Sequence, residues 1–404
     1  MEGSLVLGID SGSANTVAVL ADLAGGEPQV IGVGLVPSAG VRRGMIVDLA
    51  AASESIRAAV KQATDMAGRS GKAAVVASIG GTHIQSLICT ADVSVHRPSH
   101  GVTPEDVRRA LDESVAVVEL PSSREVIHVV PRAYRLDRAE GVINPIGLAG
   151  RRLGVEAHLI SGDALPRQNS LEAIRKAGLE VADFQVGIRA AGEAVLTRAE
   201  RETGVLLLDI GAGTTGVAVY DQGHLWHVSV LPVGGEHITA DLAALLSIPV
   251  TSSEVLKIER GWAAVDQCPD TGFELTSPSG QKAREVTDKQ VAEIIESRVL
   301  EILQLAAAQV KRSGYAGLFP AGLVLTGGTA RLKGLAALAG DSLGLSARVG
   351  CPEGPLVGSP EYATAVGLVQ WGARLAQDEA AAAVETAKQN QWERMKNWLR
   401  SLFG

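Results

Sequence analysis

The sequence carries the same short pattern twice, 199 residues apart. Residues 5–20 read LVLGIDSGSANTVAVL, and residues 205–220 read VLLLDIGAGTTGVAVY. Each is an apolar run that ends near an aspartate, followed by a glycine turn and a second apolar run. Such runs are typical of strands buried on both faces. When Asp10 is placed on Asp209, the glycines two positions later also coincide, so the pattern predicts a duplicated α/β domain.

The two turns have the chemistry of a phosphate site. Glycine lets backbone N–H groups approach an anion without interference from a Cβ atom. An aspartate at the end of a buried strand faces Mg²⁺ through water, because this ion keeps much of its hydration shell. One turn alone would be an ordinary hairpin, but two facing turns could grip a polyphosphate from both sides. The candidate phosphate-binding residues are Ser11, Gly12, Ser13, Asn15, Gly211, Ala212, Gly213, Thr214 and Thr215, and Asp10 and Asp209 are the candidate Mg²⁺ ligands and catalytic metal–water organisers.

Two further glycine turns lie in the second half of the chain. Residues 322–329 (GLVLTGGT) form another buried strand that ends in a glycine pair, and we expect a helix to start near Ala330 or Arg331. Residues 231–238 (LPVGGEHI) are a strand that breaks into a helix at a second glycine pair. Glycines before a helix N-terminus allow a nucleotide to approach closely. The candidate cofactor-binding residues added here are Gly234, Gly235, Glu236, Gly327, Gly328 and Thr329.

Composition and charge exclude several classes of protein. The net charge is −8 and no basic stripe is present, which argues against nucleic-acid binding. Hydrophobic residues make up 46 % of the chain, as in a well-packed α/β protein rather than a disordered one. The cysteines Cys89, Cys268 and Cys351 lie far apart and fit reduced thiols in a cytosolic protein. The first apolar run is too short for a signal peptide, and none reaches the roughly 20 residues of a transmembrane helix.

Taken together, these motifs resemble the actin-like ATPase superfamily, which also includes sugar kinases and the large heat-shock chaperones. The resemblance implies that the first hairpin binds the β- and γ-phosphates of ATP, that the second closes on them, and that the third turn flanks adenosine. It also implies two connecting helices, for which residues 188–197 and 362–370 match in position. The implied cofactors are ATP and Mg²⁺.

Longer segments resemble one family, the bacterial cell-division FtsA proteins. The resemblance spans about residues 4–404, and it is most specific in RGMIVDL (43–49) and near NPIGLAG (144–150). It implies an α/β, actin-like (duplicated ribonuclease-H-like) two-domain fold with an FtsA-type inserted α+β subdomain and a C-terminal amphipathic helix. The matching segments are 31–49, 143–149, 204–220, 321–335 and 362–368.

The same resemblance implies the division of the chain into domains. In the inserted subdomain, residues 101–117 predict a helix with Thr103 as N-cap and Pro104 in the first position. The expected limits are 1–83 and 166–203 for the first actin-like domain, with 362–376 returning to it, 84–165 for the inserted subdomain, 204–361 for the second actin-like domain with its insertion 236–320, 377–391 for a linker and 392–404 for a membrane-targeting helix.

The last residues, WERMKNWLRSLFG, have the pattern of a helix that lies in a membrane surface. Tryptophan and cationic neighbours both favour a lipid interface, although such a helix could instead dock on the protein itself or on a partner. Each cation near an anionic leaflet contributes about 1 kcal/mol, so one helix binds reversibly and several in a polymer bind firmly. The candidate membrane-binding residues are Trp392, Arg394, Met395, Lys396, Trp398, Leu399, Arg400, Leu402 and Phe403.

The function implied by the resemblance is that of an ATP-binding cell-division protein. Such a protein polymerises at the inner face of the cytoplasmic membrane and tethers FtsZ filaments to it. The implied partners are the C-terminal tail of the tubulin-like protein FtsZ, further copies in an actin-like filament, an anionic membrane surface and other division proteins, with no nucleic acid. The expected location is cytoplasmic, peripheral on the inner face of the cell membrane.

Two other classes of function were weighed against this one. An adaptor like the type IV pilus protein PilM shares the core and the inserted subdomain, binds a peptide from a membrane partner and needs no lipid-binding tail of its own. A small-molecule kinase would need a polar substrate pocket with a catalytic base between the domains, and no candidate for that base appears.

Three positions depart from the family pattern. FtsA chains often carry Lys where this chain has Asn15, Gly where it has Ala212 and Asp where it has Gly216. Asn15 still hydrogen-bonds a phosphate oxygen but contributes no charge, and the lost carboxylate at 216 weakens metal organisation. These departures bear on hydrolysis more than on nucleotide binding, so we expect at most slow ATPase activity. Glu193, the only carboxylate in 188–197, is a weak candidate for orienting the attacking water.

The insertion in the second domain carries two further predictions. Residues 252–261 (SSEVLKIERG) resemble the family segment that borders the nucleotide, with Ser252 as a possible helix cap. Glu254 and Lys257 lie one turn apart on one helix face, either near the ribose or base or simply on the surface. Residues 285–314 form a long amphipathic helix whose apolar face we expect in the core. The family binds the FtsZ tail through residues that fall at about 236–320 here.

Overall fold

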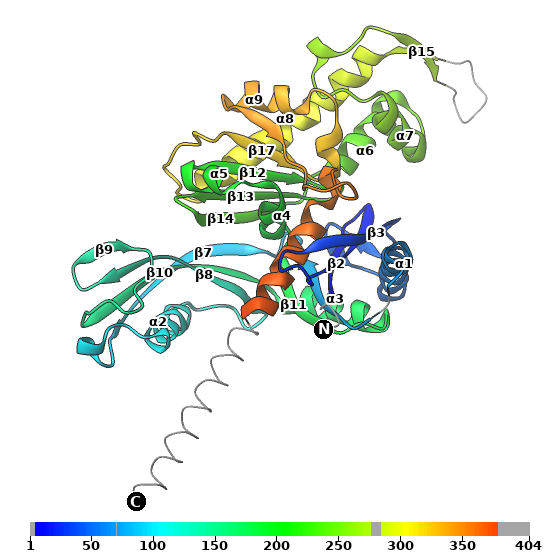
Figure 1. The fold of residues 1–404 in the computed structure, drawn as a ribbon. Helices are drawn as coiled ribbons and strands as arrows, with labels where there is room; N and C mark the ends of the chain where they lie inside the picture. The colour runs from blue at the N-terminus through cyan, green and yellow to red at the C-terminus, as the bar shows by residue number, and fades with distance from the viewer. Residues whose placement is uncertain (1–4, 70, 276–283, 379–404) are drawn as a thin grey trace, which may run out of the picture.

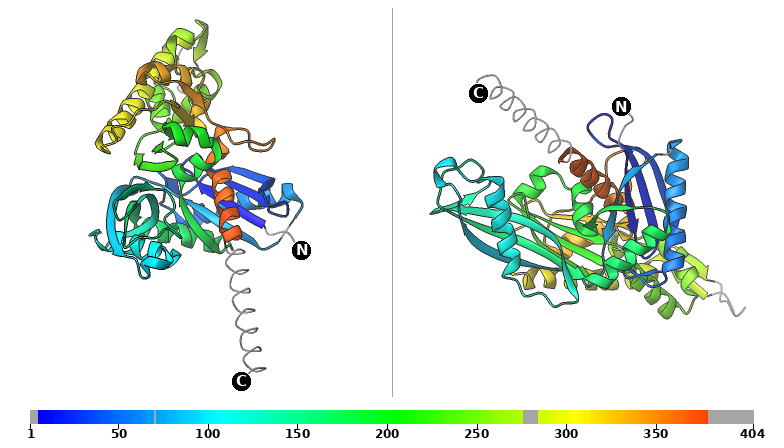
Figure 2. Two further views of the ribbon diagram at one scale, coloured as in Figure 1. Left: turned by 60° about the vertical axis from the view of Figure 1, so that its left-hand side comes forward. Right: turned by 90° about the horizontal axis from the view of Figure 1, so that it is seen from below.

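The structure is a computed structural model that describes residues 5–69, 71–275 and 284–378. Two five-stranded sheets lie one above the other in Figure 1. A four-stranded sheet lies beside the lower of them and beneath the upper one, as the views in Figure 2 also show. The candidate site lies between the two five-stranded sheets, so their construction determines its geometry.

The first sheet has the strand order β11-β6-β1-β2-β3. Strand β2 is antiparallel to both β1 and β3, whereas β6 is parallel to β1 and β11 is parallel to β6. Helices α1 and α3 cover one face and the helix over residues 363–378 covers the other, which is why the strands are apolar on both faces. The bounds are β1 (Leu5–Ser11), β2 (Asn15–Asp22), β3 (Gln29–Pro37), β6 (Ala73–Ile79), β11 (Val181–Val186), α1 (Leu49–Ala67) and α3 (Ala164–Lys176).

The second sheet repeats this construction in the order β14-β13-β12-β17-β18. Its first three strands along the chain are again antiparallel, and its last two are again parallel to β12 and to each other. Asp10 and Asp209 each stand one residue before the end of the first strand of their sheet, which confirms the duplicated fold. The bounds are β12 (Val205–Ile210), β13 (Thr215–Asp221), β14 (His224–Leu231), β17 (Leu323–Thr326) and β18 (Ala347–Val349).

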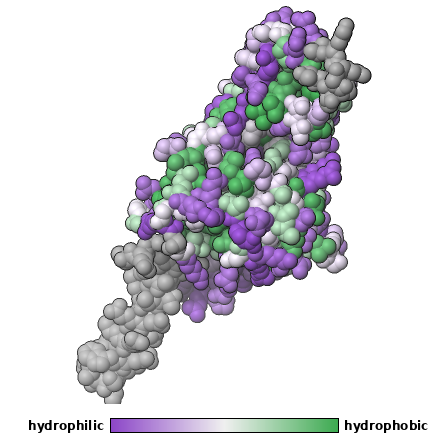
Figure 3. Space-filling view, turned by 90° about the vertical axis from the view of Figure 1, so that its right-hand side faces the viewer, coloured by the Kyte–Doolittle hydropathy of each residue, from purple (hydrophilic) through white to green (hydrophobic). Residues whose placement is uncertain are grey.

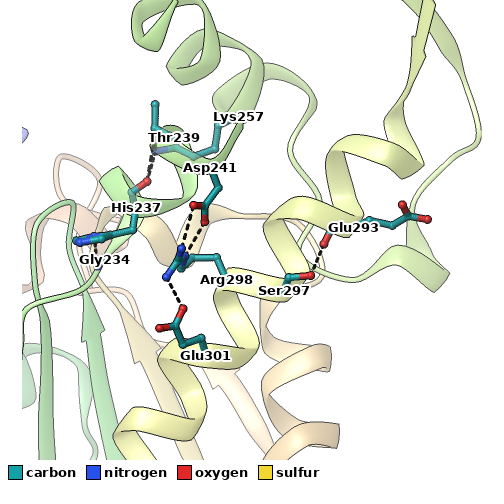
Figure 4. Close-up of polar contacts among 10 residues, drawn as sticks. Gly234, His237, Thr239, Asp241, Lys257, Glu293, Ser297, Arg298 and Glu301 are labelled. Atoms are coloured by element: carbon teal, nitrogen blue, oxygen red, sulfur yellow. Dashed lines mark hydrogen bonds and ion pairs between the residues drawn. The ribbon is translucent and has the colours of Figure 1, made fainter. Parts of the chain in front are cut away.

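Helix α8 (Asp288–Arg312) packs across the second sheet. Its side chains from Val291 to Val310 are buried at helical spacing, as the amphipathic pattern predicts. Arg298 of α8 donates to both carboxylate oxygens of Asp241 in α6, over 2.6 and 2.9 Å, and so ties the two helices together (Figure 4). The other elements here are α6 (Gly235–Leu246), α7 (Val250–Arg260), β15 (Gly272–Leu275) and β16 (Arg284–Thr287).

Two helices of the second domain begin away from their expected positions. The chain makes a 3₁₀ turn over Gly328–Arg331, and α9 (Leu335–Leu343) begins only after it. The expected start near Ala330 or Arg331 is therefore wrong. The reason is that the hydroxyl of Thr329 donates to the Gly211 carbonyl, which holds this stretch against the second turn. Helix α7 begins directly after Pro249, so Ser252 lies inside its first turn and is not its cap.

The inserted subdomain is a four-stranded antiparallel sheet with one helix on it. The helix α2 (Pro104–Ala116) begins with a capping box, in which the Thr103 hydroxyl accepts from the Asp106 N–H and the Asp106 carboxylate accepts from the Thr103 N–H. The predicted cap and first-turn proline are thus confirmed. The strand order is β7-β10-β8-β9, with bounds β7 (Gln85–Ser94), β8 (Arg124–Leu136), β9 (Ala139–Val142) and β10 (Arg152–Asp163).

Two helices connect the domains, as the resemblance implies. Helix α4 (Gly187–Val195) leads from the first sheet toward α5 (Arg198–Thr203) and the second. The helix over residues 363–378 runs back from the second sheet along the first (Figure 1). The two helices touch closely, because a Cβ atom on Gly367 would lie 1.8 Å from the carbonyl oxygen of Ala190.

Buried histidines lie where the inserted subdomain meets the second sheet. His158 of β10 is 1 % exposed, and His128 of β8 and His227 of β14 are half-buried. Burial lowers the pKa of His158 and of His128 to about 3 and that of His227 to about 4. Burial is the main cause of the low pKa of His158, and nearby positive charges, including Arg132, contribute to it. All three imidazoles are therefore uncharged at neutral pH, and protonating them would place unfavourable charges at this junction.

This junction should make the fold sensitive to acid. An unfolded histidine has a pKa of about 6.5, so the unfolded chain takes up protons that the folded chain refuses as the pH falls from about 6.5 toward 4. The contribution of the neutral histidines to the free energy of unfolding is fully present above this pH window and is lost as the pH falls through it. The free energy of unfolding of the wild type falls between pH 7.5 and pH 5. We expect this fall to be smaller by about 1–2 kcal/mol in His158→Gln, as measured by urea denaturation. The exposed His100→Gln serves as control, and equal pH dependence of all three proteins would contradict the assignment.

Candidate functional site

A cavity of about 550 Å³ lies between the two five-stranded sheets. This volume is in the ordinary range for a small-molecule site. Both halves of the duplication contribute to its wall. Of the predicted site residues, those that line it are Asp10, Ser11, Gly12, Ser13, Asn15, Asp209, Gly211, Ala212, Gly213, Thr214, Glu254, Lys257, Gly327, Gly328 and Thr329.

The two glycine turns have matching backbone geometry. The N–H of Gly12 donates to the carbonyl of Asn15 over 3.0 Å, and the N–H of Gly211 donates to the carbonyl of Thr214 over 2.9 Å. The turns also approach each other across the cavity, because a Cβ atom on Gly213 would lie 2.6 Å from the hydroxyl oxygen of Ser13. The two sheets therefore present one continuous rim of backbone and small polar side chains.

The aspartates at the base of the cavity repel each other. Burial raises the pKa of Asp10, against the lowering effect of the hydrogen bond that Ser78 donates over 2.6 Å. Burial, and after it the charge of Asp10, raise the pKa of Asp209 to about 7. A divalent cation between the two carboxylates would relieve this repulsion, and carboxylate oxygens with water suit Mg²⁺. The donor set therefore fits the expected ion, although no three His, Cys, Asp or Glu side chains gather into a metal cluster among the described residues.

Four predicted site residues support the cavity from behind rather than lining it. The N–H groups of Gly235 and Glu236 donate to the carbonyls of Gly211 and Ala212 over 2.9 and 2.8 Å. Gly234 lies under the same turn, where a Cβ atom would be 2.6 Å from both carbonyl oxygens. The fourth is Thr215, which is fully buried and donates to the Val233 carbonyl. Together these contacts fix the shape of the second turn.

Lys257 and Glu254 form one polar cluster on the wall of the cavity. The Lys257 ammonium pairs with Glu254 over 2.7 Å and donates to the Thr239 hydroxyl over 2.8 Å and to the Gly235 carbonyl over 3.1 Å. Figure 4 shows Lys257 reaching from α7 to Thr239 on α6. The cluster therefore joins the wall formed by α7 to the glycine pair that supports the second turn.

Glu193 does not line the cavity. Its carboxylate pairs with Arg201 over 2.8 Å and with Arg374 over 2.6 Å. Burial alone would raise the pKa of Glu193, but these two guanidinium groups lower it below the ordinary value. The geometry gives Glu193 a structural role between α4, α5 and the helix over 363–378, and its carboxylate is not placed to orient water in the cavity.

Several residues at the site were not identified in the sequence. Ser78 lies near the end of the buried strand β6, the glycine pair Gly80-Gly81 follows that strand, and all three line the cavity. A polar residue before glycines at a strand end is the sequence signal for them. Thr364, which donates to Asp209 over 3.4 Å, lies 155 residues away in a helix and gives no comparable signal. Arg331 and Lys333 also line the cavity.

The predicted membrane-binding residues, from Trp392 to Phe403, lie outside the described residues. Among residues 5–69, 71–275 and 284–378, no single helix has both the length and the apolar character to cross a membrane. Helices α6 and α7 meet this test only as a pair, and that pair is bent by 110°.

The two matching sheets and the cavity between them define the actin-like ATPase class of fold. Solved structures agree: the PilM–PilN type IV pilus biogenesis complex matches with a TM-score of 0.66 at 20 % identity, covering 91 % of this chain and 98 % of that one. MreB5 of Spiroplasma citri bound to AMPPNP matches with a TM-score of 0.53 at 14 % identity, covering 95 % and 99 %. At these identities the likeness concerns the fold alone.

Sequence relatives narrow the class to a family. The family model for cell division protein FtsA matches residues 206–367, and the model for the SHS2 domain inserted in FtsA matches residues 81–161. Cell division protein FtsA of Pseudomonas aeruginosa is 34 % identical over 99 % of both chains. That of Bacillus subtilis is 36 % identical over 92 % of this chain and 84 % of its own length. The chain belongs to the FtsA family of cell-division proteins.

Proposed function

We propose that this protein binds ATP with Mg²⁺ in the cavity, polymerises as an actin-like filament at the inner face of the cytoplasmic membrane, and tethers FtsZ filaments there. The observation that carries the nucleotide part is the pair of glycine turns, one from each sheet, that face each other across one cavity. Membership of the FtsA family supports the remaining parts, together with the domain limits expected from the sequence.

We assign a role in this proposal to each group of residues at the cavity. The first turn, from Ser11 to Asn15, and the second, from Gly211 to Thr214, bind the phosphates through backbone N–H groups and hydroxyls. Asp10 and Asp209 hold Mg²⁺ through water, and this ion supplies positive charge that the two carboxylates and the phosphates share. The glycine pair before Thr329 flanks adenosine, and the Lys257–Glu254 cluster borders the ribose or base.

We propose at most slow hydrolysis for this site. Gly216 stands where the family often has aspartate, and a Cβ atom there would lie 2.8 Å from the Cβ of Ile188 on α4. Ile188 thus fills the space in which a carboxylate would otherwise help to organise the metal. Asn15 leaves the first turn uncharged. Both features preserve phosphate binding while removing charged groups from the region where the chemistry would occur.

We place the FtsZ tail on residues 236–320, as in the family. In this segment α6 and α7 expose large apolar side chains, and Figure 3 shows hydrophobic residues gathered on the upper part of the face that it draws. A short partner segment that covered them would bury apolar area and gain affinity. The exposed side chains are Leu245, Val250, Val255 and Ile258.

Co-sedimentation with vesicles tests the tethering function. The full chain and a chain truncated before Trp392 are each mixed with vesicles of anionic lipid, with MgATP, and FtsZ is added in a second step. We expect the full chain to sediment with the vesicles and to bring FtsZ with it, whereas the truncated chain stays in the supernatant. Equal sedimentation of both chains would reject the tail assignment, and an adaptor of the PilM type would then be the better interpretation.

A further inference from the structure

A short hairpin of the first domain reaches into the mouth of the cavity. It consists of β4 (Val41–Arg42) and β5 (Met45–Ile46), joined by Arg43 and Gly44. Both residues of the tip have a positive φ, 50° for Arg43 and 72° for Gly44. This conformation is ordinary for glycine but uncommon for arginine. A two-residue hairpin turn requires a positive φ at both positions, so the hairpin itself imposes this conformation on Arg43.

The surroundings of the tip are the two phosphate-binding turns. The N–H of Gly44 donates to the hydroxyl oxygen of Ser13 in the first turn over 3.3 Å, and Gly44 itself lines the cavity. In the second turn, a Cβ atom on Gly213 would lie 3.1 Å from the Cα and 3.2 Å from the N of Arg43. The hairpin tip therefore touches both turns, and it touches the second across the opening between the domains.

Among the residues that the structure describes, no cation belongs to the two turns at the phosphate end of the cavity. Neither turn contains Lys or Arg in residues 11–15 or 211–214. The cations that line the described part of the cavity all come from the second domain and are already engaged: Lys257 with Glu254, Arg331 with Glu361 over 2.9 Å, and Lys333 above the Trp262 ring. The charge of Mg²⁺ is offset by the two aspartates, so most of the negative charge of a triphosphate would stay unbalanced.

We propose that Arg43 is the cation that binds the terminal phosphate of ATP, an assignment that rests on the nucleotide site proposed above. Its side chain is exposed, and the six bonds from its Cα to a terminal nitrogen give it a reach of roughly 7 Å from a Cα that lies against the Gly213 turn. A guanidinium binds phosphate oxygens through two parallel hydrogen bonds. Because ADP has no terminal phosphate, Arg43 distinguishes the triphosphate from the diphosphate and couples that difference to the contact between the domains.

Nucleotide titration of single variants tests this assignment. The affinities of AMPPNP and ADP, each with Mg²⁺, are measured for the wild type, Arg43→Gln, Arg43→Gly and, as a matched control, the neighbouring exposed Arg42→Gln. We expect both Arg43 variants to lose about 10- to 100-fold in affinity for AMPPNP and less than about threefold for ADP, as for a charged hydrogen bond. Arg42→Gln should leave both affinities unchanged. Arg43→Gly removes the cation while relieving the backbone, so it separates the loss of charge from backbone distortion.

The outcomes distinguish the two levels of the proposal. If wild type binds AMPPNP and ADP but the Arg43 variants match it, or lose both nucleotides equally, the role of Arg43 is rejected and the nucleotide site stands. If wild type binds neither nucleotide, the nucleotide site is rejected and the role of Arg43 with it.

Discussion

Replacement of Gly213 by valine is expected to lower the affinity for MgATP by at least about 100-fold, which corresponds to about 2.7 kcal/mol. The reason is steric. A Cβ atom at this position would lie 2.6 Å from the hydroxyl oxygen of Ser13 and 3.1 Å from the Cα of Arg43, so the larger side chain wedges the two turns apart. Neither turn could then contact the phosphates held by the other. A radioligand or fluorescent-nucleotide titration measures the effect.

The wedge should act on the site more than on the fold, because Gly213 lies on the rim of the cavity and belongs to no core cluster among the described residues. Gly25→Val is the matched control, since a Cβ atom on Gly25 meets no protein atom within 4 Å. It should retain the affinity of the wild type. Unchanged affinity in Gly213→Val would show that nucleotide does not bind between the paired turns.

Gly367→Leu is expected to destabilise the whole protein by more than about 4 kcal/mol, the range of severe overpacking and disrupted helix contacts. A Cβ atom on Gly367 would lie 1.8 Å from the carbonyl oxygen of Ala190 and 2.4 Å from its carbonyl carbon. Backbone cannot move aside as the end of a flexible side chain can, so the two connecting helices must separate. Thermal unfolding followed by circular dichroism, or loss of soluble expression, measures the effect.

A second glycine of the same helix pair serves as the control. A Cβ atom on Gly187 would meet only the methyl group of Thr364, at an ordinary 3.7 Å. Gly187→Ala should therefore leave the stability unchanged or raise it slightly, because alanine favours the helix that glycine does not. If Gly367→Leu unfolded at the same temperature as Gly187→Ala, the close crossing of the two helices would be disproved.

The architecture could be predicted because its main signals are local in the sequence. The strands that end near Asp10 and Asp209 consist of apolar residues, which by itself indicates that they are buried. The repeat of the pattern implies that the two sheets are alike. The sequence signals for the cap at Thr103 and for the buried face of α8 are also local, since each depends on residues three or four positions apart. All of these agree with the structure.

The rest of the site depends on contacts between distant residues. Thr364 and Asp209 are 155 positions apart, and Ser78 and Asp10 are 68 apart, so no local pattern connects them. Glu193 is a similar case. A lone carboxylate in a connecting helix suggests a catalytic role, but in the structure two arginines from other helices form ion pairs with it. The start of α9 cannot be predicted locally, because Thr329 donates to the carbonyl of Gly211, more than a hundred residues earlier.

The final described helix has a mechanical consequence. Near its start Thr364 donates to Asp209 at the base of the cavity, and further along Trp371 donates to Asp183 at the far side of the first sheet. A helix of this length, residues 363–378, is roughly 24 Å from end to end. The helix therefore connects the base of the cavity to the far side of the first sheet, and a tilt of roughly 5° at its start would displace its other end by about 2 Å.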